Sequence, residues 1–264
     1  MDLGLKDKVI VCLSSAAGIG RGIATELARE GAKVVITTAE PFKKDLDAAV
    51  EYIEKETGNR PYTYISDIKD PDSIVKLIND AAKDLGGIYG LVNLCPGPKA
   101  GGFDAVNEAD WADGYEKCLH SYIVAIRAAL PYMKEGGKGR ILNSTSSSIK
   151  QALDNLIISN TFRMGVVGLS KSLAREFGKD DILVNTIGPG RIYTDRIKYL
   201  NTMRAEKEGI TEEEYTKRDS ADFPQRRYQT VDEIGRLAAF LMSEANGSLT
   251  GQSFLCDGAM TTAY

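Results

Sequence analysis

Residues 9–20 read Val9-Ile10-Val11-Cys12-Leu13-Ser14-Ser15-Ala16-Ala17-Gly18-Ile19-Gly20. The first five of them form a continuous apolar run, which is typical of a buried strand. Two glycines then allow a tight turn, and Ile23, Leu27 and Ala28 recur beyond it at the spacing of one helix face. This stretch therefore predicts a buried strand that enters a helix through a glycine turn.

Apolar, β-branched runs of the same kind recur along the chain and alternate with longer stretches of helical periodicity. The strand-like runs lie near residues 8–13, 33–37, 61–66, 88–94, 139–144, 182–187 and 253–256. Strands that alternate with helices pair in parallel through right-handed crossovers. The sequence therefore predicts an α/β protein, a Rossmann-type doubly wound three-layer sandwich with a central, mainly parallel seven-stranded sheet.

Length and composition indicate one domain spanning residues 1–264. Of the 264 residues, 43% are apolar and 27% are charged, which suffices for one substantial core. The net charge of -4 gives no reason to expect nucleic acid or an anionic membrane as a partner. The apolar run at residues 9–13 is too short for a signal-peptide core or a membrane span.

The number and spacing of the cysteines indicate whether the chain has a metal site and in which kind of compartment it resides. Cys12, Cys95, Cys118 and Cys256 are far apart in the sequence, and the chain has a single histidine. No zinc-ligand spacing results, so we expect no metal site. Cysteines without a disulfide pattern are typical of a reducing compartment, which predicts a cytoplasmic location.

Further short motifs follow the glycine turn in a fixed order. They are Leu91-Val92-Asn93, then Asn185-Thr186-Ile187-Gly188-Pro189-Gly190 with Thr194, then Thr250-Gly251-Gln252 and Cys256-Asp257-Gly258. Their order and spacing resemble the short-chain dehydrogenase/reductase family, whose motifs are T-G-x-x-x-G-I-G, N-N-A-G, P-G-x-x-x-T, T-G-Q and V-D-G-G. The resemblance covers nearly the whole chain. It implies an enzyme that uses NAD or NADP to interconvert a carbonyl and a secondary alcohol.

The glycine turn is the first candidate cofactor site. A nucleotide pyrophosphate needs backbone N–H groups at a helix N-terminus with no side chain in the way, which Gly18 and Gly20 permit. The longer fingerprint G-x-G-x-x-G is not satisfied, because Ile23 occupies its last position. The match is to the family's own spacing, with Ser14 in place of the first glycine. The alternative is a strand-to-helix turn that binds nothing.

Other positions fit a bound dinucleotide by resemblance. Asp67 lies where the family's aspartate meets the adenine, and Asn93 lies where the first asparagine of N-N-A-G supports the same region. The complete expected cofactor set is Ser14, Gly18, Ile19, Gly20, Asp67, Ile68, Asn93, Arg163, Pro189, Gly190, Ile192 and Thr194. Structural alternatives remain open, because Asp67 can cap the turn before Pro71 and Asn93 can tie two strands together. The segment Leu94-Cys95-Pro96 departs from N-A-G, so the loop beside the nicotinamide is altered.

The choice between NAD and NADP depends on the end of the second strand. An acidic side chain there accepts from the ribose 2′-OH, whereas a basic one receives a 2′-phosphate. Glu40 can serve NAD, while Arg21, Lys43 or Lys44 can serve NADP. Any of them can instead be a solvated surface charge. The balance favours NADP slightly.

The resemblance also locates the catalytic positions of the family's asparagine, serine, tyrosine and lysine tetrad. Ser146 lies at the serine position, Cys118 at the asparagine, Ser159 at the tyrosine and Arg163 at the lysine. The segment Ser159-Asn160-Thr161-Phe162-Arg163 resembles an atypical branch of the family with an S-N-x-x-R motif. We expect Ser146 to polarise the carbonyl oxygen and Arg163 to position the cofactor.

The replacements change the chemistry of proton transfer. A serine hydroxyl is much less acidic than a phenol, so Ser159 is a poor general acid, and the Arg163 guanidinium can bind but cannot shuttle a proton. Lys150 is the first candidate for the proton, because a buried lysine can exchange one near neutral pH. His120 is the second, and Tyr115 and Tyr122 are weaker candidates. As structural alternatives, Lys150 is an exposed lysine and His120 a packing side chain.

Three functional hypotheses follow. The first is an NAD(P)-dependent oxidoreductase with a small-molecule carbonyl or alcohol substrate and a non-standard catalytic site. The second is a catalytically silent subunit or regulator that binds nucleotide or pairs with an active paralogue. The third is a lyase or isomerase, which a reactive Cys118 would support. The resemblance further implies a dimer or homotetramer formed through residues 104–134 and 152–178, and a helical substrate lid at about 194–224.

Overall fold

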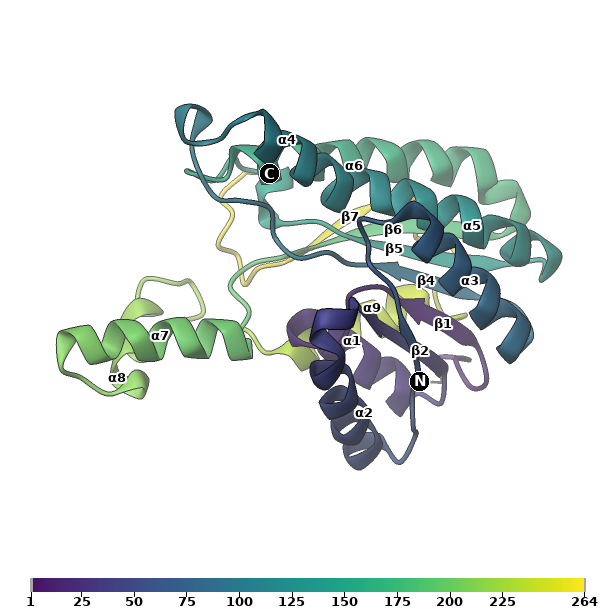
Figure 1. The fold of residues 1–264 in the computed structure, drawn as a ribbon, viewed down its shortest axis with the longest axis horizontal. Helices are drawn as coiled ribbons and strands as arrows, with labels where there is room; N and C mark the ends of the chain where they lie inside the picture. The colour runs from purple at the N-terminus through teal and green to yellow at the C-terminus, as the bar shows by residue number, and fades with distance from the viewer. Residues whose placement is uncertain (1, 264) are drawn as a thin grey trace.

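A computed structural model of the protein describes residues 2–263 and has at its centre one seven-stranded sheet (Figure 1). The strands are β1 (Val9–Cys12), β2 (Lys33–Thr38), β3 (Tyr62–Ile65), β4 (Gly90–Asn93), β5 (Gly139–Ser144), β6 (Ile182–Pro189) and β7 (Ser253–Cys256). Their order is β3-β2-β1-β4-β5-β6-β7, and every pair is parallel. The predicted doubly wound sandwich is confirmed, and all seven predicted strands are present.

Helices cover both faces of the sheet. One face carries α1 (Gly18–Arg29), α2 (Lys43–Thr57) and α9 (Val231–Met242). The other carries α3 (Pro71–Leu85), α5 (Ser121–Glu135) and α6 (Ile157–Phe177), with α4 (Glu108–Tyr115) beside α6. Short 3-10 or π turns lie between these elements. They are η1 (Glu40–Phe42), η2 (Phe103–Ala105), η3 (Glu116–His120), η4 (Ser147–Ile149) and η5 (Gly178–Asp180).

Two apolar layers follow from the alternation of side chains along the strands. In β1, Ile10 and Cys12 pack toward α1, α2 and α9, whereas Val9 and Val11 pack toward α3, α5 and α6. Because both faces are covered, the central strands are apolar throughout, as is usual for parallel sheets. Each large aliphatic side chain buried in these layers contributes about 1.5–3 kcal/mol.

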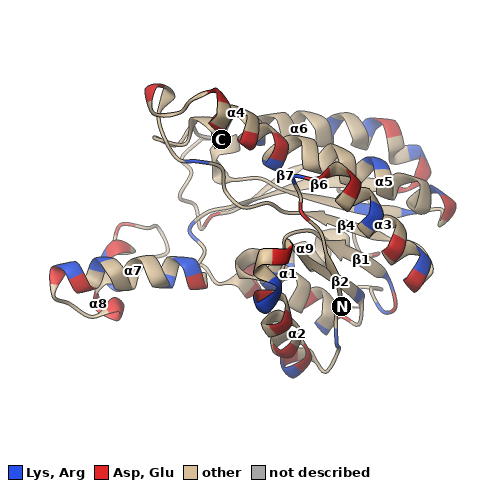
Figure 2. Cartoon of the chain, viewed as in Figure 1, with Lys and Arg blue, Asp and Glu red and all other residues tan. Residues whose placement is uncertain are grey.

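The segment at residues 194–224 is helical, as predicted. It forms α7 (Asp195–Glu208) and α8 (Glu212–Asp219), which project from the body of the protein in Figure 1. Basic and acidic residues intermingle along α2, α3 and α7 in Figure 2, in keeping with the small net charge. Within residues 2–263, the structure contains no helix that is both long and apolar enough to cross a membrane.

Two glycines bring α1 and α9 into close contact. A Cβ on Gly22 would lie 2.6 Å from the Cβ of Val231 and 2.9 Å from its carbonyl oxygen. A Cβ on Gly235 would lie 2.8 Å from the carbonyl oxygen of Gly22. All three distances are shorter than real contacts allow, so the approach of the two helices requires glycine at both positions. This packing fixes α1, whose first turn contributes to the candidate site described below.

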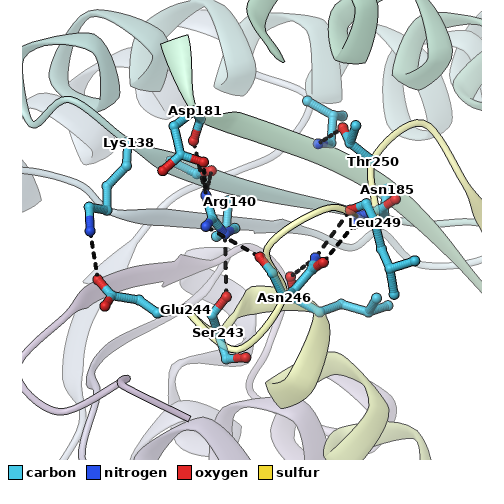
Figure 3. Close-up of polar contacts among 12 residues, drawn as sticks. Lys138, Arg140, Asp181, Asn185, Ser243, Glu244, Asn246, Leu249 and Thr250 are labelled. Atoms are coloured by element: carbon cyan, nitrogen blue, oxygen red, sulfur yellow. Dashed lines mark hydrogen bonds and ion pairs between the residues drawn. The ribbon is translucent and has the colours of Figure 1, made fainter. Parts of the chain in front are cut away.

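The amino-terminal edge of the sheet is held by Arg140, a buried residue that is 3% exposed (Figure 3). Its guanidinium donates to the carbonyl oxygens of Gly139 (2.8 Å), Asp181 (2.9 Å), Ser243 (3.3 Å) and Asn246 (3.4 Å). One side chain thereby joins β5 to the loops before β6 and after α9. Lys138 forms a more exposed ion pair with Glu244 in the same view.

We predict that Gly22→Ala destabilises the protein by about 1–3 kcal/mol, because the added methyl group would overpack the contact with Val231. The measurement is the urea midpoint of unfolding at fixed protein concentration. Gly168→Ala in α6 is the control, since nothing lies within 4 Å of the added Cβ there, and it should gain about 0.4–1 kcal/mol. Equal midpoints for the two variants would contradict the proposed contact.

We predict that Arg140→Met lowers stability by about 2–3 kcal/mol, because buried carbonyl oxygens would lose a charged donor. Lys138→Met removes only a partly exposed ion pair and should cost less. Urea unfolding of both variants tests the difference. A loss for Lys138→Met as large as for Arg140→Met would refute the role given to Arg140.

Candidate active site

A cavity of about 400 Å³ opens at the carboxyl ends of β1, β4, β5 and β6. Its lining consists of Ser14, Ala17, Gly18, Ile19, Gly20, Leu94, Cys95, Pro96, Ser144, Thr145, Arg163, Pro189, Thr194, Asp195 and Arg196. Ligands of open parallel sheets bind at the carboxyl edge where the strand order reverses, which here lies between β1 and β4. A larger hollow, of about 570 Å³, lies at the opposite edge, beside Lys8 and Tyr89, so position in the fold rather than volume identifies the candidate site.

Thr37 on β2 fastens the loop that follows β1. Its hydroxyl accepts from the backbone N–H of Ser14 at 3.1 Å, and its carbonyl oxygen accepts from that of Ser15 at 2.9 Å. The Ser15 hydroxyl donates to the carbonyl oxygen of Cys12 at 2.6 Å. Ser14 has a φ of 47°, a left-handed conformation that favours glycine. The loop thus keeps the backbone shape of a glycine at a position where the sequence has serine.

The first turn of α1 faces the cavity with its backbone N–H groups uncapped. The N-cap residue, Ala17, makes no side-chain hydrogen bond, and this turn has no acidic residue. Gly18 has a φ of 54°, and a Cβ there would point at Thr194, 3.5 Å from its Cγ2. Gly20 has no room for a Cβ, which would lie 2.7 Å from the Cα of Ser15. Such a helix start can hold an anionic group such as a pyrophosphate.

Arg163 on α6 is 6% exposed and stands in the wall of the cavity. One of its terminal nitrogens donates to the carbonyl oxygen of Ser144 at 2.7 Å and to the hydroxyl of Tyr122 at 3.1 Å. The other donates to the sulfur of Cys95 at 3.1 Å. Its Nε is buried without a partner. Burial alone would lower the pKa of Arg163, but the opposing effect of its neighbours, Cys95 first among them, outweighs burial, and the pKa rises.

Cys95 carries the negative charge of this group. A hydrogen bond from the Cys118 thiol and the nearby charge of Arg163 lower the pKa of Cys95 to about 6, against the opposite effect of burial. The same contact with Cys95, together with burial, raises the pKa of Cys118. Burial and the charge of Cys95 likewise raise the pKa of Tyr122. These shifts favour the thiolate form of Cys95 beside Arg163 and the neutral forms of Cys118 and Tyr122.

The expected catalytic residues lie in different surroundings. Ser146 caps η4, where its oxygen accepts from the backbone N–H of Ser148 at 3.1 Å. Ser159 is buried near the start of α6. Neither is among the described residues that line the cavity. Lys150 is exposed at the end of η4, so the burial on which its candidacy depended is absent.

His120 and Tyr115 stack on one another, with ring centroids 5.5 Å apart. This contact fits the structural alternative given for His120, a packing side chain. Tyr122, by contrast, is fully buried and contacts both Arg163 and Cys95. Of the two tyrosines, Tyr122 is thus the one that contacts residues of the cavity lining.

The expected cofactor residues divide into two groups. Those that line the cavity are Ser14, Gly18, Ile19, Gly20, Arg163, Pro189 and Thr194, whereas Asp67, Ile68, Asn93, Gly190 and Ile192 are outside its described lining. A Cβ on Gly190 would lie 2.6 Å from the Cα of Asp257, so this glycine serves a close backbone approach. Ile192 is buried and pairs with Gln229 through an isolated bridge.

Asp67 and Asn93 both have the structural contacts named as their alternatives. A carboxylate oxygen of Asp67 accepts from the backbone N–H of Lys69 at 2.9 Å within a local turn. The Asn93 amide donates to the side-chain oxygen of Asn143 at 2.7 Å and so joins β4 to β5. The Asn93 side-chain oxygen itself is buried without a partner.

Cys95 was not predicted from the sequence as a site residue. The available signal was the departure of Leu94-Cys95-Pro96 from the N-A-G motif, combined with the unusual Cys118 and Arg163. Cys95, Cys118 and Arg163 are far apart in the sequence, and only the fold brings their side chains into contact.

Comparisons with known proteins agree with this architecture. The family profile described as Enoyl-(Acyl carrier protein) reductase matches residues 14–261. A probable galactose dehydrogenase of Rhizobium meliloti is 27% identical over 256 residues, which cover 97% of this chain and 96% of that protein. A D-beta-hydroxybutyrate dehydrogenase of Cupriavidus necator is 31% identical over 259 residues, which cover 96% and 98%.

Among solved structures, the L-sorbose reductase of Gluconobacter frateurii, complexed with NADPH and L-sorbose, superposes with a TM-score of 0.94. It is 26% identical in sequence, and the match covers 100% of both chains. The ordered motifs, the parallel sheet of seven strands and these full-length matches lead to one conclusion: the chain belongs to the short-chain dehydrogenase/reductase family.

Proposed function

We propose that the protein is an NAD(P)-dependent oxidoreductase that interconverts a carbonyl and a secondary alcohol. The observation that carries this proposal is that the uncapped first turn of α1 and the buried Arg163 face the same cavity. An anion-binding helix start beside a fixed positive charge suits a dinucleotide. The relatives named above are dehydrogenases and reductases, and the L-sorbose reductase structure contains NADPH, which supports the proposal.

In this proposal, the start of α1 binds the pyrophosphate. Gly18 leaves the N–H groups accessible, Thr194 lies next to Gly18, and Arg196 lines the same cavity. The nicotinamide of the bound dinucleotide supplies or accepts the hydride. Arg163 contributes a positive charge that does not titrate in the physiological range, held in one orientation by Ser144 and Tyr122.

Ser146 is the proposed carbonyl-binding hydroxyl. Its oxygen already accepts from the N–H of Ser148, so its own O–H can donate to a substrate oxygen. Ser159 takes the place of the family's tyrosine without its acidity. Lys150 would have to fold inward to reach the cavity from its exposed position.

The S-N-x-x-R segment has a local physical rationale. The Asn160 amide donates to the carbonyl oxygen of Leu153 at 2.9 Å and so holds the loop before α6. One helical turn further on, Arg163 holds the end of β5 through Ser144. We propose that this pair of contacts defines an atypical branch, in which the arginine organises the cavity wall rather than relaying a proton.

We also propose that α7 and α8 form the substrate lid. Thr194 caps α7 at the cavity, and the neighbouring Asp195 pairs with Arg21 of α1 at 3.0 Å. The lid is therefore attached to the same helix whose start binds the cofactor. Arg21 also stacks over the ring of Tyr52 at 4.6 Å, on α2, the helix that follows β2 and η1. This position supports a preference for NADP, whose 2′-phosphate would compete with the exposed Asp195 for the guanidinium.

Cofactor binding is tested with two substitutions at Gly18 that differ in charge. Asn and Asp tolerate left-handed backbone better than other side chains do, so Gly18→Asn and Gly18→Asp should perturb the loop similarly. We predict that Gly18→Asp binds NADPH at least about tenfold more weakly than Gly18→Asn, because a carboxylate would repel the pyrophosphate. Nicotinamide fluorescence on titration gives both affinities. No binding of NADPH or NADH by the unmodified protein would refute the proposal and favour a silent subunit.

Cofactor preference is tested at Arg21. We predict that Arg21→Gln weakens NADPH binding about tenfold and leaves NADH binding within about twofold, because only NADPH carries the 2′-phosphate. Glu40→Gln is the matched control, which should leave NADPH binding unaffected. If Arg21→Gln weakens both cofactors equally, then Arg21 acts through Asp195 and the lid instead.

A further inference from the structure

Two cysteines from different parts of the chain face one another beside the cavity, Cys95 in its lining and Cys118 buried behind it. Their sulfur atoms lie 3.7 Å apart. The sulfur of Cys95 lies 3.1 Å from a terminal nitrogen of Arg163 and 3.6 Å from the hydroxyl of Tyr122. We propose that Cys95 and Cys118 form an oxidisable thiol pair, in which Cys95 reacts with a small hydroperoxide and Cys118 then closes a disulfide with it.

The secondary structure explains why these side chains meet. Cys95 lies on the loop after β4 and lines the cavity. Cys118 lies on the π-helical turn η3, which joins α4 to α5 and widens the helix by one residue at this point. Cys118 is fully buried, so an incoming reagent meets Cys95 first. A bond between the two sulfurs would require them to approach from 3.7 Å to about 2.05 Å.

The charges around Cys95 favour reaction at this sulfur. From α6, Arg163 supplies a cation within hydrogen-bond distance. From α5 and η3, Tyr122 and Cys118 supply neutral donors, while Lys117 acts on the pair from farther away. No carboxylate is among these neighbours in the described structure. Because the thiolate is the nucleophile, a cysteine in such electropositive surroundings is the reactive one of a pair.

The other two cysteines lack this arrangement. Cys12 is fully buried in the apolar layer beside α1, and burial raises its pKa. Cys256 is partly buried, and burial followed by the charges of Glu233 and Asp257 raises its pKa. Both therefore remain thiols at neutral pH. Cys256 is the useful internal control, since it is accessible in part yet not activated.

The chemistry balances with a hydroperoxide as the two-electron oxidant. The Cys95 thiolate attacks one peroxide oxygen, so that an S–O bond forms, the O–O bond breaks and the released oxygen leaves as water or an alcohol after taking up a proton. The Cys118 sulfur then attacks the Cys95 sulfur. An S–S bond forms, the S–O bond breaks, and the hydroxide that leaves takes the Cys118 proton to become water.

The disulfide would change the electrostatics of the cavity. It is neutral, so Arg163 would lose its anionic partner and keep only Ser144 and Tyr122. The cavity wall would become more positive by one charge. This inference concerns the thiols themselves and does not depend on the proposed oxidoreductase activity.

The first test measures the reactivity of Cys95 in the folded protein. Iodoacetamide labelling followed by peptide mass spectrometry gives the rate at each cysteine between pH 5 and 9. We predict that labelling of Cys95 rises with a midpoint near the value of about 6 to which its pKa is lowered, while Cys256 labels only at higher pH. Arg163→Met and Cys118→Ala should each move the Cys95 midpoint upward, because each removes a group that stabilises the thiolate. A midpoint in the ordinary range near 8.5 would overturn the proposal.

The second test uses hydrogen peroxide. Folded protein treated at neutral pH, then alkylated and digested, should yield a peptide in which Cys95 is cross-linked to Cys118, and a thiol reductant should reverse it. Cys256→Ser should form the same cross-link as the unmodified protein. Cys118→Ser should instead accumulate the sulfenic or sulfinic form of Cys95. Oxidation of Cys95 in the unmodified protein without a cross-link to Cys118 would refute the pair, even if Cys95 proved reactive.

Discussion

The buried guanidinium of Arg163 determines how the candidate site is built. A cation with only 6% of its surface exposed needs an anion or several acceptors around it, because an unpaired buried charge costs several kcal/mol. Ser144, Tyr122 and Cys95 provide those partners from three different elements. Three positions at which the sequence departs from the motifs that it resembles, Cys95, Cys118 and Arg163, therefore lie in one contact network. The charge of Arg163 is thereby compensated within the site itself.

The opposite wall of the cavity depends on a different constraint, the left-handed backbone after β1. Ser14 adopts a conformation that costs a non-glycine residue about 1–2 kcal/mol. The hydrogen bond from its N–H to Thr37 offsets part of that cost and holds the loop against β2. Gly20 then brings the start of α1 against Ser15, and Gly22 brings the same helix against α9. These contacts allow α1 only one position, in which its uncapped N–H groups reach the cavity.

Periodicity was sufficient to predict the sheet, since each strand is an apolar run and each crossover a helical pattern. The glycine turn could also be predicted, because Gly18 and Gly20 lie close together in the sequence with the strand and helix that they join. Periodicity could not predict which side chains meet across the fold. The contact between Cys95 and Cys118 depends on the π-helical turn that holds Cys118, which has no sequence signature. The positions of Ser146 and Lys150 depend on η4, which they flank. The role of Arg140 could not be predicted from the sequence either, because it donates to backbone carbonyls in loops about 40 and 100 residues away.

The contacts that stabilise the sheet and the groups of the candidate site lie at opposite edges of the sheet. Arg140 and Arg163 are both buried arginines, yet their partners differ in kind. At the amino-terminal edge, the shorter contacts of Arg140 are with carbonyl oxygens, which neither titrate nor oxidise. A longer contact of 3.4 Å joins it to the Asp181 carboxylate. At the carboxyl edge, the partner of Arg163 is a sulfur that can lose its charge by protonation or by oxidation. A change at Cys95 therefore alters the electrostatics of the cavity, while the contacts that hold β5 to the loops at the other edge stay in place.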